Sequence, residues 1–73
     1  MSDIFRKGQK VIWDWGGGTA TGQIKDRYER KVTRKIKGSE ITRNGDSDNP
    51  AYLLEQDDGD EVLKLASELK PAH

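Results

Sequence analysis

Val11, Trp13 and Trp15 recur at every second position of residues 10–15, "KVIWDW", with Ile12 and Asp14 between them, and this periodicity of two predicts a β-strand. The alternation places Val11, Trp13 and Trp15 on one face of the strand. Two of the five aromatic residues of the chain, both tryptophans, thus lie on a single face. That face is either part of the core or part of a binding site, and the pattern alone leaves both open for Trp15.

Three glycines at 16–18 allow the chain to reverse, and a second strand is expected over 19–28. One face of this strand carries Ala20, Gly22, Ile24, Asp26 and Tyr28. Because Ala20 and Gly22 are small, they leave room for a large side chain opposite them. We therefore assign Trp13 to the core, with its indole over these two positions.

The segment "VTRKIKGSEITR", residues 32–43, predicts a hairpin with a two-residue turn at Lys37 and Gly38. This turn fixes the pairs Val32–Arg43, Thr33–Thr42, Arg34–Ile41, Lys35–Glu40 and Ile36–Ser39. The threonine pair and the opposite-charge pair then share one face. Val32, Ile36 and Ile41 gather on the other.

A polar loop at 44–50 leads to a second hairpin, with strands over 51–56 and 61–65 and a turn about Asp58 and Gly59. The ending "ASELK" predicts a short helical turn capped by Ser67. Some five short strands without a long crossover predict an all-β fold, a small and strongly bent antiparallel barrel with a protruding hairpin near 32–43. At 73 residues the chain forms one domain.

The composition indicates a thin core, since hydrophobic residues make up 32% of the chain and charged residues 36%. The net charge is zero, but the basic and acidic residues are unevenly divided along the chain. Residues 1–45 hold 11 Lys and Arg against 5 Asp and Glu, whereas residues 46–73 hold 2 against 8. Such a division marks either an anion-binding face or basic and acidic strands that lie against each other, and we favour the second interpretation.

The chain has no cysteine, no apolar run long enough for a membrane helix, and no apolar stretch of a signal peptide in residues 1–10. We expect a cytoplasmic protein with no membrane partner. Its state is expected to be a monomer or a weak self-associate through an exposed strand edge.

Catalytic and cofactor chemistry finds little support in the sequence. The only histidine, His73, is terminal, and the G-x-x-x-x-G spacing of Gly17 and Gly22 lacks the lysine of a phosphate loop. The acidic run "DDGDE", residues 57–61, lacks the ligand order of a calcium loop and predicts a turn. We therefore expect no enzyme activity, no cofactor and no metal.

A basic segment offers an alternative function. Residues 25–37, "KDRYERKVTRKIK", carry seven Lys or Arg against two acids, and small barrels bind single strands through basic grooves with aromatic platforms. In this alternative the phosphate contacts are Arg27, Arg30, Lys31, Arg34, Lys35 and Lys37. Alternation spreads these cations over both faces of a ribbon, and a solvated hairpin is the simpler interpretation.

Four motifs occur together in this chain: W-x-W-G-x-G, K-G-x-x-x-T-R, N-P-A-Y and L-K-x-x-S-E-L. Together they resemble the Tudor-like domain family named for hypervirulence-associated proteins, which includes free-standing small bacterial proteins. The similarity extends from about Phe5 to Leu69. The resemblance implies an SH3-like barrel and says little about activity.

In the wider Tudor group, which the resemblance brings in, an aromatic cage at one end of the barrel holds a methylated ammonium group by cation–π attraction. The matching aromatic candidates here are Trp15, Tyr28 and Tyr52, with Asp14 or Asp26 as a carboxylate partner. We therefore expect a non-catalytic binding module that takes a peptide or protein near an aromatic mouth formed by these residues.

Overall fold

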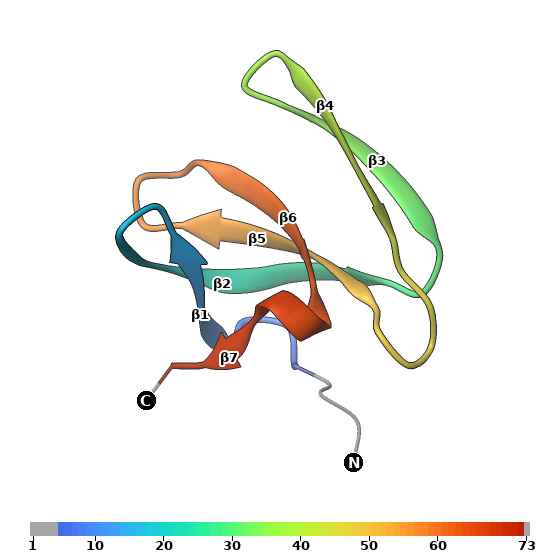
Figure 1. The fold of residues 1–73 in the computed structure, drawn as a ribbon, viewed down its shortest axis with the longest axis horizontal. Coiled ribbons are helices and arrows are strands. Elements are labelled where there is room, and N and C mark those ends of the chain that lie inside the picture. Colours follow the sequence, from blue (N-terminus) through green and yellow to red (C-terminus); the bar gives the residue numbers. More distant parts are fainter. Residues whose placement is uncertain (1–4, 73) are drawn as a thin grey trace.

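The computed structural model describes residues 5–72, which fold almost entirely as antiparallel strands (Figure 1). The elements are β1 (Lys10–Trp15), β2 (Gly18–Tyr28), β3 (Lys31–Ile36), β4 (Ser39–Asn44), β5 (Ala51–Gln56), β6 (Glu61–Leu65), the 3₁₀ helix η1 (Ala66–Glu68) and β7 (Lys70–Pro71). The all-β prediction is confirmed, with six strands of five or more residues within residues 5–72 in place of the five or so expected, and the two-residue β7 in addition.

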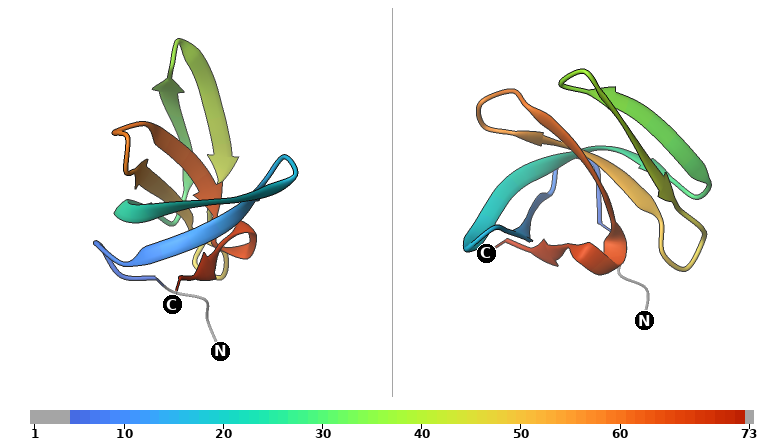
Figure 2. Two further views of the ribbon diagram at one scale, coloured as in Figure 1. Left: turned by 90° about the vertical axis from the view of Figure 1, so that its left-hand side faces the viewer. Right: turned by 45° about the horizontal axis from the view of Figure 1, so that its top comes forward.

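The strands form two sheets. Five of them make a curled sheet in the order β6-β5-β2-β1-β7, and β3 and β4 form a separate ribbon that arches over it (Figure 2). The prediction of a closed barrel is wrong, because within residues 5–72 β6 and β7 each pair on one side only. β7 has two residues and pairs with β1, and β6 pairs with β5, so a seam stays open between the two sheet edges.

β2 is the longest strand and takes part in both halves of the sheet. It pairs with β1 through residues 18–23 and with β5 through residues 22–28, and its register with β5 shifts between Ile24 and Asp26. A bulge of this kind bends a strand and reverses which face its later residues occupy. The prediction that Tyr28 shares a face with Ile24 is therefore wrong, and the two side chains enter different clusters.

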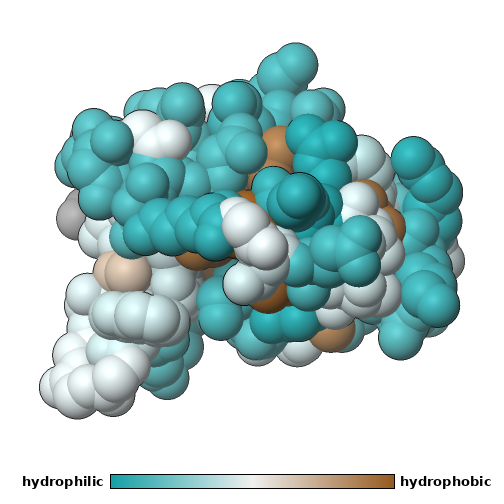
Figure 3. All heavy atoms as spheres, turned by 90° about the horizontal axis from the view of Figure 1, so that it is seen from above, coloured by the Kyte–Doolittle hydropathy of each residue, from teal (hydrophilic) through white to brown (hydrophobic). Residues whose placement is uncertain are grey.

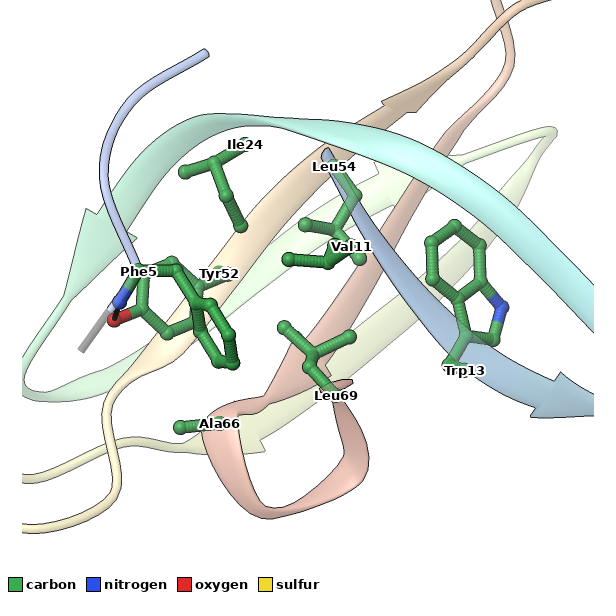
Figure 4. Packing of buried hydrophobic residues seen from close by; sticks show 8 residues of the cluster. All are labelled: Phe5, Val11, Trp13, Ile24, Tyr52, Leu54, Ala66 and Leu69. Carbon is green, nitrogen blue, oxygen red and sulfur yellow. Dashed lines mark hydrogen bonds between the residues drawn. The ribbon is translucent and has the colours of Figure 1, made fainter. Parts of the chain in front are cut away.

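The first core cluster fills the inside of the curled sheet (Figure 4). It contains Phe5, Val11, Trp13, Ile24, Tyr52, Leu54, Ala66 and Leu69. The core assignment of Trp13 is confirmed, since its side chain is only 3% exposed. Gly22 lies beneath it, and a Cβ built on Gly22 would stand 2.9 Å from Cη2 of the indole. The predicted space for a large side chain over β2 is thus occupied by Trp13.

A second cluster lies between the outer face of the sheet and the β3–β4 ribbon. Val32, Ala51, Leu53 and Leu63 form its centre, with Tyr28, Ile36, Ile41 and Leu65 packed around them. Because β5 serves both clusters, its residues 51–54 are all buried. An unbroken apolar run is typical of a strand covered on both faces. The ribbon therefore covers the outer face of the sheet and also protrudes from it.

The ribbon has the register predicted from its sequence. All five predicted pairs are present, and the hydroxyls of Thr33 and Thr42 are 2.8 Å apart. The turn residues Lys37 and Gly38 both have positive φ, 51° and 80°. This is the combination that a type I′ hairpin turn requires, so the turn twists in the same sense as the strands.

The helical turn near the C-terminus is present, but its predicted cap is wrong. η1 begins after Leu65, whose N–H donates to Oε1 of Glu68. Ser67 lies within the turn and instead exchanges hydrogen bonds with the Asn49 side chain. The turn is thereby fastened to the loop that precedes β5.

Candidate functional site: a groove along the edge of β6

A groove of about 560 Å³ lies between the β3–β4 ribbon and the β5–β6 hairpin. From the ribbon it is lined by Ile36, Lys37, Ser39, Ile41 and Arg43. From the other side it is lined by Gln56, Asp58, Asp60, Glu61, Val62, Leu63 and Lys64, and Trp15 joins them from the end of β1. In the space-filling view from above, apolar atoms appear only in small areas between hydrophilic side chains (Figure 3).

Side chains from both faces of β6 take part in this lining. Leu63 belongs to the cluster under the ribbon, whereas Val62 packs on the cluster inside the curled sheet. Successive residues of a strand point to opposite faces, so a groove over one face would be lined by alternate residues only. The groove therefore follows the edge of β6, which is one side of the open seam.

Trp15 is the aromatic residue that the structure places at this groove. It pairs with Gly18 at the end of the β1–β2 hairpin, where the neighbouring glycines have no side chains to cover the indole. Its side chain is 70% exposed, and it is the single exposed large hydrophobic residue within residues 5–72. Of the two roles that the sequence left open for Trp15, the structure favours the surface role.

The other members of the expected aromatic mouth lie elsewhere. Tyr52 is fully buried, and its hydroxyl accepts a hydrogen bond of 3.0 Å from the N–H of Phe5. Tyr28 is half-buried at the far end of β2, with the guanidinium of Arg30 5.3 Å from its ring centre. Asp14 is exposed on the face of β1 opposite Trp15. The four residues do not converge: Asp14 and Trp15 point to opposite faces of β1, and Tyr52 lies in the core. The bulge of β2 directs Tyr28 to the second cluster.

Two ion pairs join the ribbon to the rest of the fold, one to the β5–β6 hairpin across the groove and one to η1. At one end the Lys37 ammonium lies 2.7 Å from Oδ2 of Asp60, and this hydrogen bond raises the pKa of Lys37 above its ordinary value. At the other end Nε of Arg43 lies 3.5 Å from Oε1 of Glu68. All four side chains are about a third or more exposed, so solvent screens both pairs and each adds little to stability.

A third contact links the halves through the bulge of β2. Lys25 donates to Oε2 of Glu61 at 2.9 Å, and that bond raises the pKa of Lys25. The ammonium is also 4.0 Å from Glu55. Together with the two pairs at the groove, these contacts set basic residues of the first 45 positions against acidic residues of the last 28. These contacts agree with the favoured interpretation of the charge division.

The six candidate phosphate contacts are divided in the structure. Arg27 is paired with Glu29, whose hydrogen bond raises the pKa of Arg27, and Lys37 is held by Asp60. Arg30, Lys31, Arg34 and Lys35 form no ion pair with any residue of 5–72. On β3, Lys31 and Lys35 face one side of the ribbon, and Arg34 faces the other.

Sequence reasoning missed the ribbon and β6 as parts of the site. Ile41 and Leu63 line the groove, but in the sequence they look like ordinary core residues of two separate hairpins. One signal was available, the unbroken apolar run at 51–54, which predicts that both faces of β5 are covered. Covering the outer face requires the 32–43 hairpin, and this places its apolar face beside β6.

These features define a small all-β fold with an open seam and an exposed tryptophan. A model of the hypervirulence associated proteins TUDOR domain family matches residues 8–69, nearly the whole chain, and the protein belongs to this family. Comparisons with curated proteins and with solved structures gave no match. No helix within residues 5–72 has the length and apolar character needed to cross a membrane.

Proposed function

We propose that this protein is a non-catalytic module that binds a segment of another protein in the groove along β6, with Trp15 as the main contact. The exposed indole is the observation that carries the proposal. In a chain with few apolar residues, an uncovered tryptophan beside a groove is unusual, and tryptophans are among the residues that contribute most at protein interfaces. The module is expected to act in the cytoplasm without a cofactor.

The charges along the groove support a polypeptide partner. Near Trp15, Asp58 forms no ion pair with any residue of 5–72. Asp60 pairs with one lysine, Lys37, and Glu61 pairs with another, Lys25. At the other end Arg43 and Lys64 share one carboxylate, Glu68. The groove therefore has an acidic end and a basic end. A segment with a basic residue at one end, an apolar centre and an acidic residue at the other end complements it.

The nucleic-acid alternative has weaker support. Two of its six cations are already neutralised within the chain, and the three on β3 are split between the two faces of the ribbon. A nucleic-acid site usually concentrates its positive charge on one face. Lys35 also lies opposite Glu40 in the register of the ribbon. These features favour the protein partner, and the oligonucleotide titration described below tests the alternative.

A selection from a random peptide library on the immobilised protein supplies a defined probe. Peptides enriched on the wild type are then synthesised and their affinities measured for the wild type and for Trp15→Ala. We expect Trp15→Ala to fold normally, because the indole is exposed, and to weaken binding at least about tenfold. Asp14→Ala is the matched control, since it changes the adjacent exposed residue on the opposite face of β1.

Asp14→Ala should leave the affinity within about twofold of the wild type. Equal binding by Trp15→Ala and the wild type would overturn the proposed site. Failure to enrich any peptide above the background of the empty support would overturn the proposed function itself.

A further inference from the structure

The backbone of β6 has a defined orientation with respect to β5. The N–H of Gln56 donates to the carbonyl of Asp60, and the N–H of Ala66 donates to the carbonyl of Pro50, so even-numbered residues at both ends of β6 face β5. Alternate residues of a strand direct their backbone groups to the same side. Val62 and Lys64, paired with Leu54 and Tyr52, therefore bond to β5 as well.

The odd-numbered residues of β6 face the opposite way. Leu65 confirms this, since its N–H donates to the side chain of Glu68 rather than to β5. The N–H and C=O groups of Glu61 and Leu63 must then point away from β5, toward the groove that both residues line. Within residues 5–72 no strand pairs with this side of β6, and no backbone bond from Glu61 or Leu63 to another segment is found.

β4 does not supply the missing pairing, although it runs alongside β6. The ribbon is a separate two-stranded sheet, and it contacts β6 through side chains, with Ile41 and Leu63 in the same cluster. Lys37 at the tip of the ribbon and Asp60 at the tip of the β5–β6 hairpin are joined by an ion pair. The groove thus combines an unpaired strand edge with apolar side chains on either side of it.

We propose that the partner segment binds as an added β-strand on the free edge of β6. This inference rests on the proposed function and specifies how the segment is held. Main-chain bonds to Glu61 and Leu63 supply the pairing, and this mode of recognition is common where a sheet edge is exposed. Alternate side chains of the segment then point to Ile41 on one side and to Trp15 and Val62 on the other.

The size of the edge limits the length of the segment. β6 has five residues, so the added strand pairs over about four or five residues. The acidic residues near Trp15 and the basic pair at the other end place the basic residue of the segment beside Asp58 and its acidic residue beside Lys64. The Lys37–Asp60 pair crosses the groove, so Lys37→Gln should raise the affinity a few-fold by opening it.

Two measurements on the selected peptide test the added strand. First, each backbone nitrogen of the peptide is methylated in turn, which removes one donor at a time. We expect a loss of at least about tenfold at alternate positions and small effects between them, because only every second residue of a strand faces β6. Second, amide hydrogen exchange of the protein is compared with and without peptide. The amides of Glu61 and Leu63 should slow at least about tenfold, whereas those of Val62 and Lys64, already bonded to β5, serve as internal controls.

The outcomes separate the two proposals. Binding that needs Trp15 but shows no alternation in the methylation series and no slowing at Glu61 and Leu63 would overturn the added strand and keep the proposed function. Binding insensitive to Trp15→Ala would overturn both. A protein that is dimeric by light scattering, with Glu61 and Leu63 protected before any peptide is added, would show that a second copy occupies the edge and would overturn the assignment to another protein.

Discussion

The indole of Trp13 occupies the space that a side chain at Gly22 would need. A Cβ on Gly22 would stand 2.9 Å from Cη2 of Trp13 and 2.9 Å from the carbonyl oxygen of Glu55. Both neighbours are fixed, one in the core and the other in the backbone of β5. The close approach of β1, β2 and β5 at this point therefore depends on a glycine.

Gly22→Ala is expected to destabilise the fold by about 1 to 3 kcal/mol, as overpacking in a core does. Chemical unfolding followed by tryptophan fluorescence measures the change. Gly17→Ala is the matched control, because no heavy atom lies within 4 Å of a Cβ built there, and it should change stability by less than about 0.5 kcal/mol. Equal stability of the two variants would contradict the packing of Trp13 on Gly22.

The two clusters predict that the ribbon can open separately from the rest of the sheet. Val32→Ala removes packing under the ribbon, and Val11→Ala makes the same change inside the curled sheet. Each should lower stability by about 2 kcal/mol. In amide hydrogen exchange, Val32→Ala should speed exchange in β3 and β4 more than in β1 and β2. Uniform acceleration along the whole chain in Val32→Ala would argue against a separate ribbon.

The ion pair between Lys37 and Asp60 across the groove has a predictable pH dependence. The pKa of Lys37 is raised in the folded state by the bond to Asp60, so the contact is fully present below the ordinary lysine value of about 10.4 and is lost as the pH rises through the higher folded value. A ¹³Cε titration of Lys37 measures this midpoint. We expect it to fall in Asp60→Asn and to fall less in Asp58→Asn, the more weakly interacting neighbour. An unchanged midpoint in Asp60→Asn would exclude the ion pair in solution.

The nucleic-acid alternative makes a distinct prediction. With a short single-stranded or duplex oligonucleotide, fluorescence polarisation should show no binding at about 200 mM salt and at most weak binding at about 20 mM. The reason is that Arg27 and Lys37 are paired and the remaining cations do not share one face. Tight binding that falls steeply with salt and is lost in a Lys31→Ala, Lys35→Ala double variant would contradict the protein-binding proposal.

The strands and their registers could be predicted from the sequence because they depend on local patterns. The register of the ribbon followed from one turn, Lys37–Gly38, and the core position of Trp13 followed from the small residues Ala20 and Gly22 across the hairpin. The bulge at Lys25 could not be predicted from alternation. It depends on how β2 bends between two partner strands, and it moved Tyr28 to the other cluster.

The site could be predicted only in part, because it also depends on contacts between segments that are far apart in the sequence. Trp15 is predicted as a contact because of its place in the W-x-W-G-x-G stretch, and it does line the groove. Residue type alone does not separate Tyr52 from Tyr28. The hydroxyl of Tyr52 accepts a hydrogen bond inside the core from the N–H of Phe5, a partner 47 positions away. The free edge of β6 depends on the failure of the sheet to close, which is a property of the whole fold.

Binding along β6 is tested most directly by an amide NMR titration of the ¹⁵N-labelled protein with a selected peptide, at about 20 mM salt and again at about 200 mM. Binding along β6 predicts shifts at Trp15, Ile41 and the β6 residues, which persist at the higher salt because apolar contacts and main-chain bonds are not screened. Shifts confined to residues 25–37 that vanish at the higher salt would contradict it and place the binding surface on the basic ribbon.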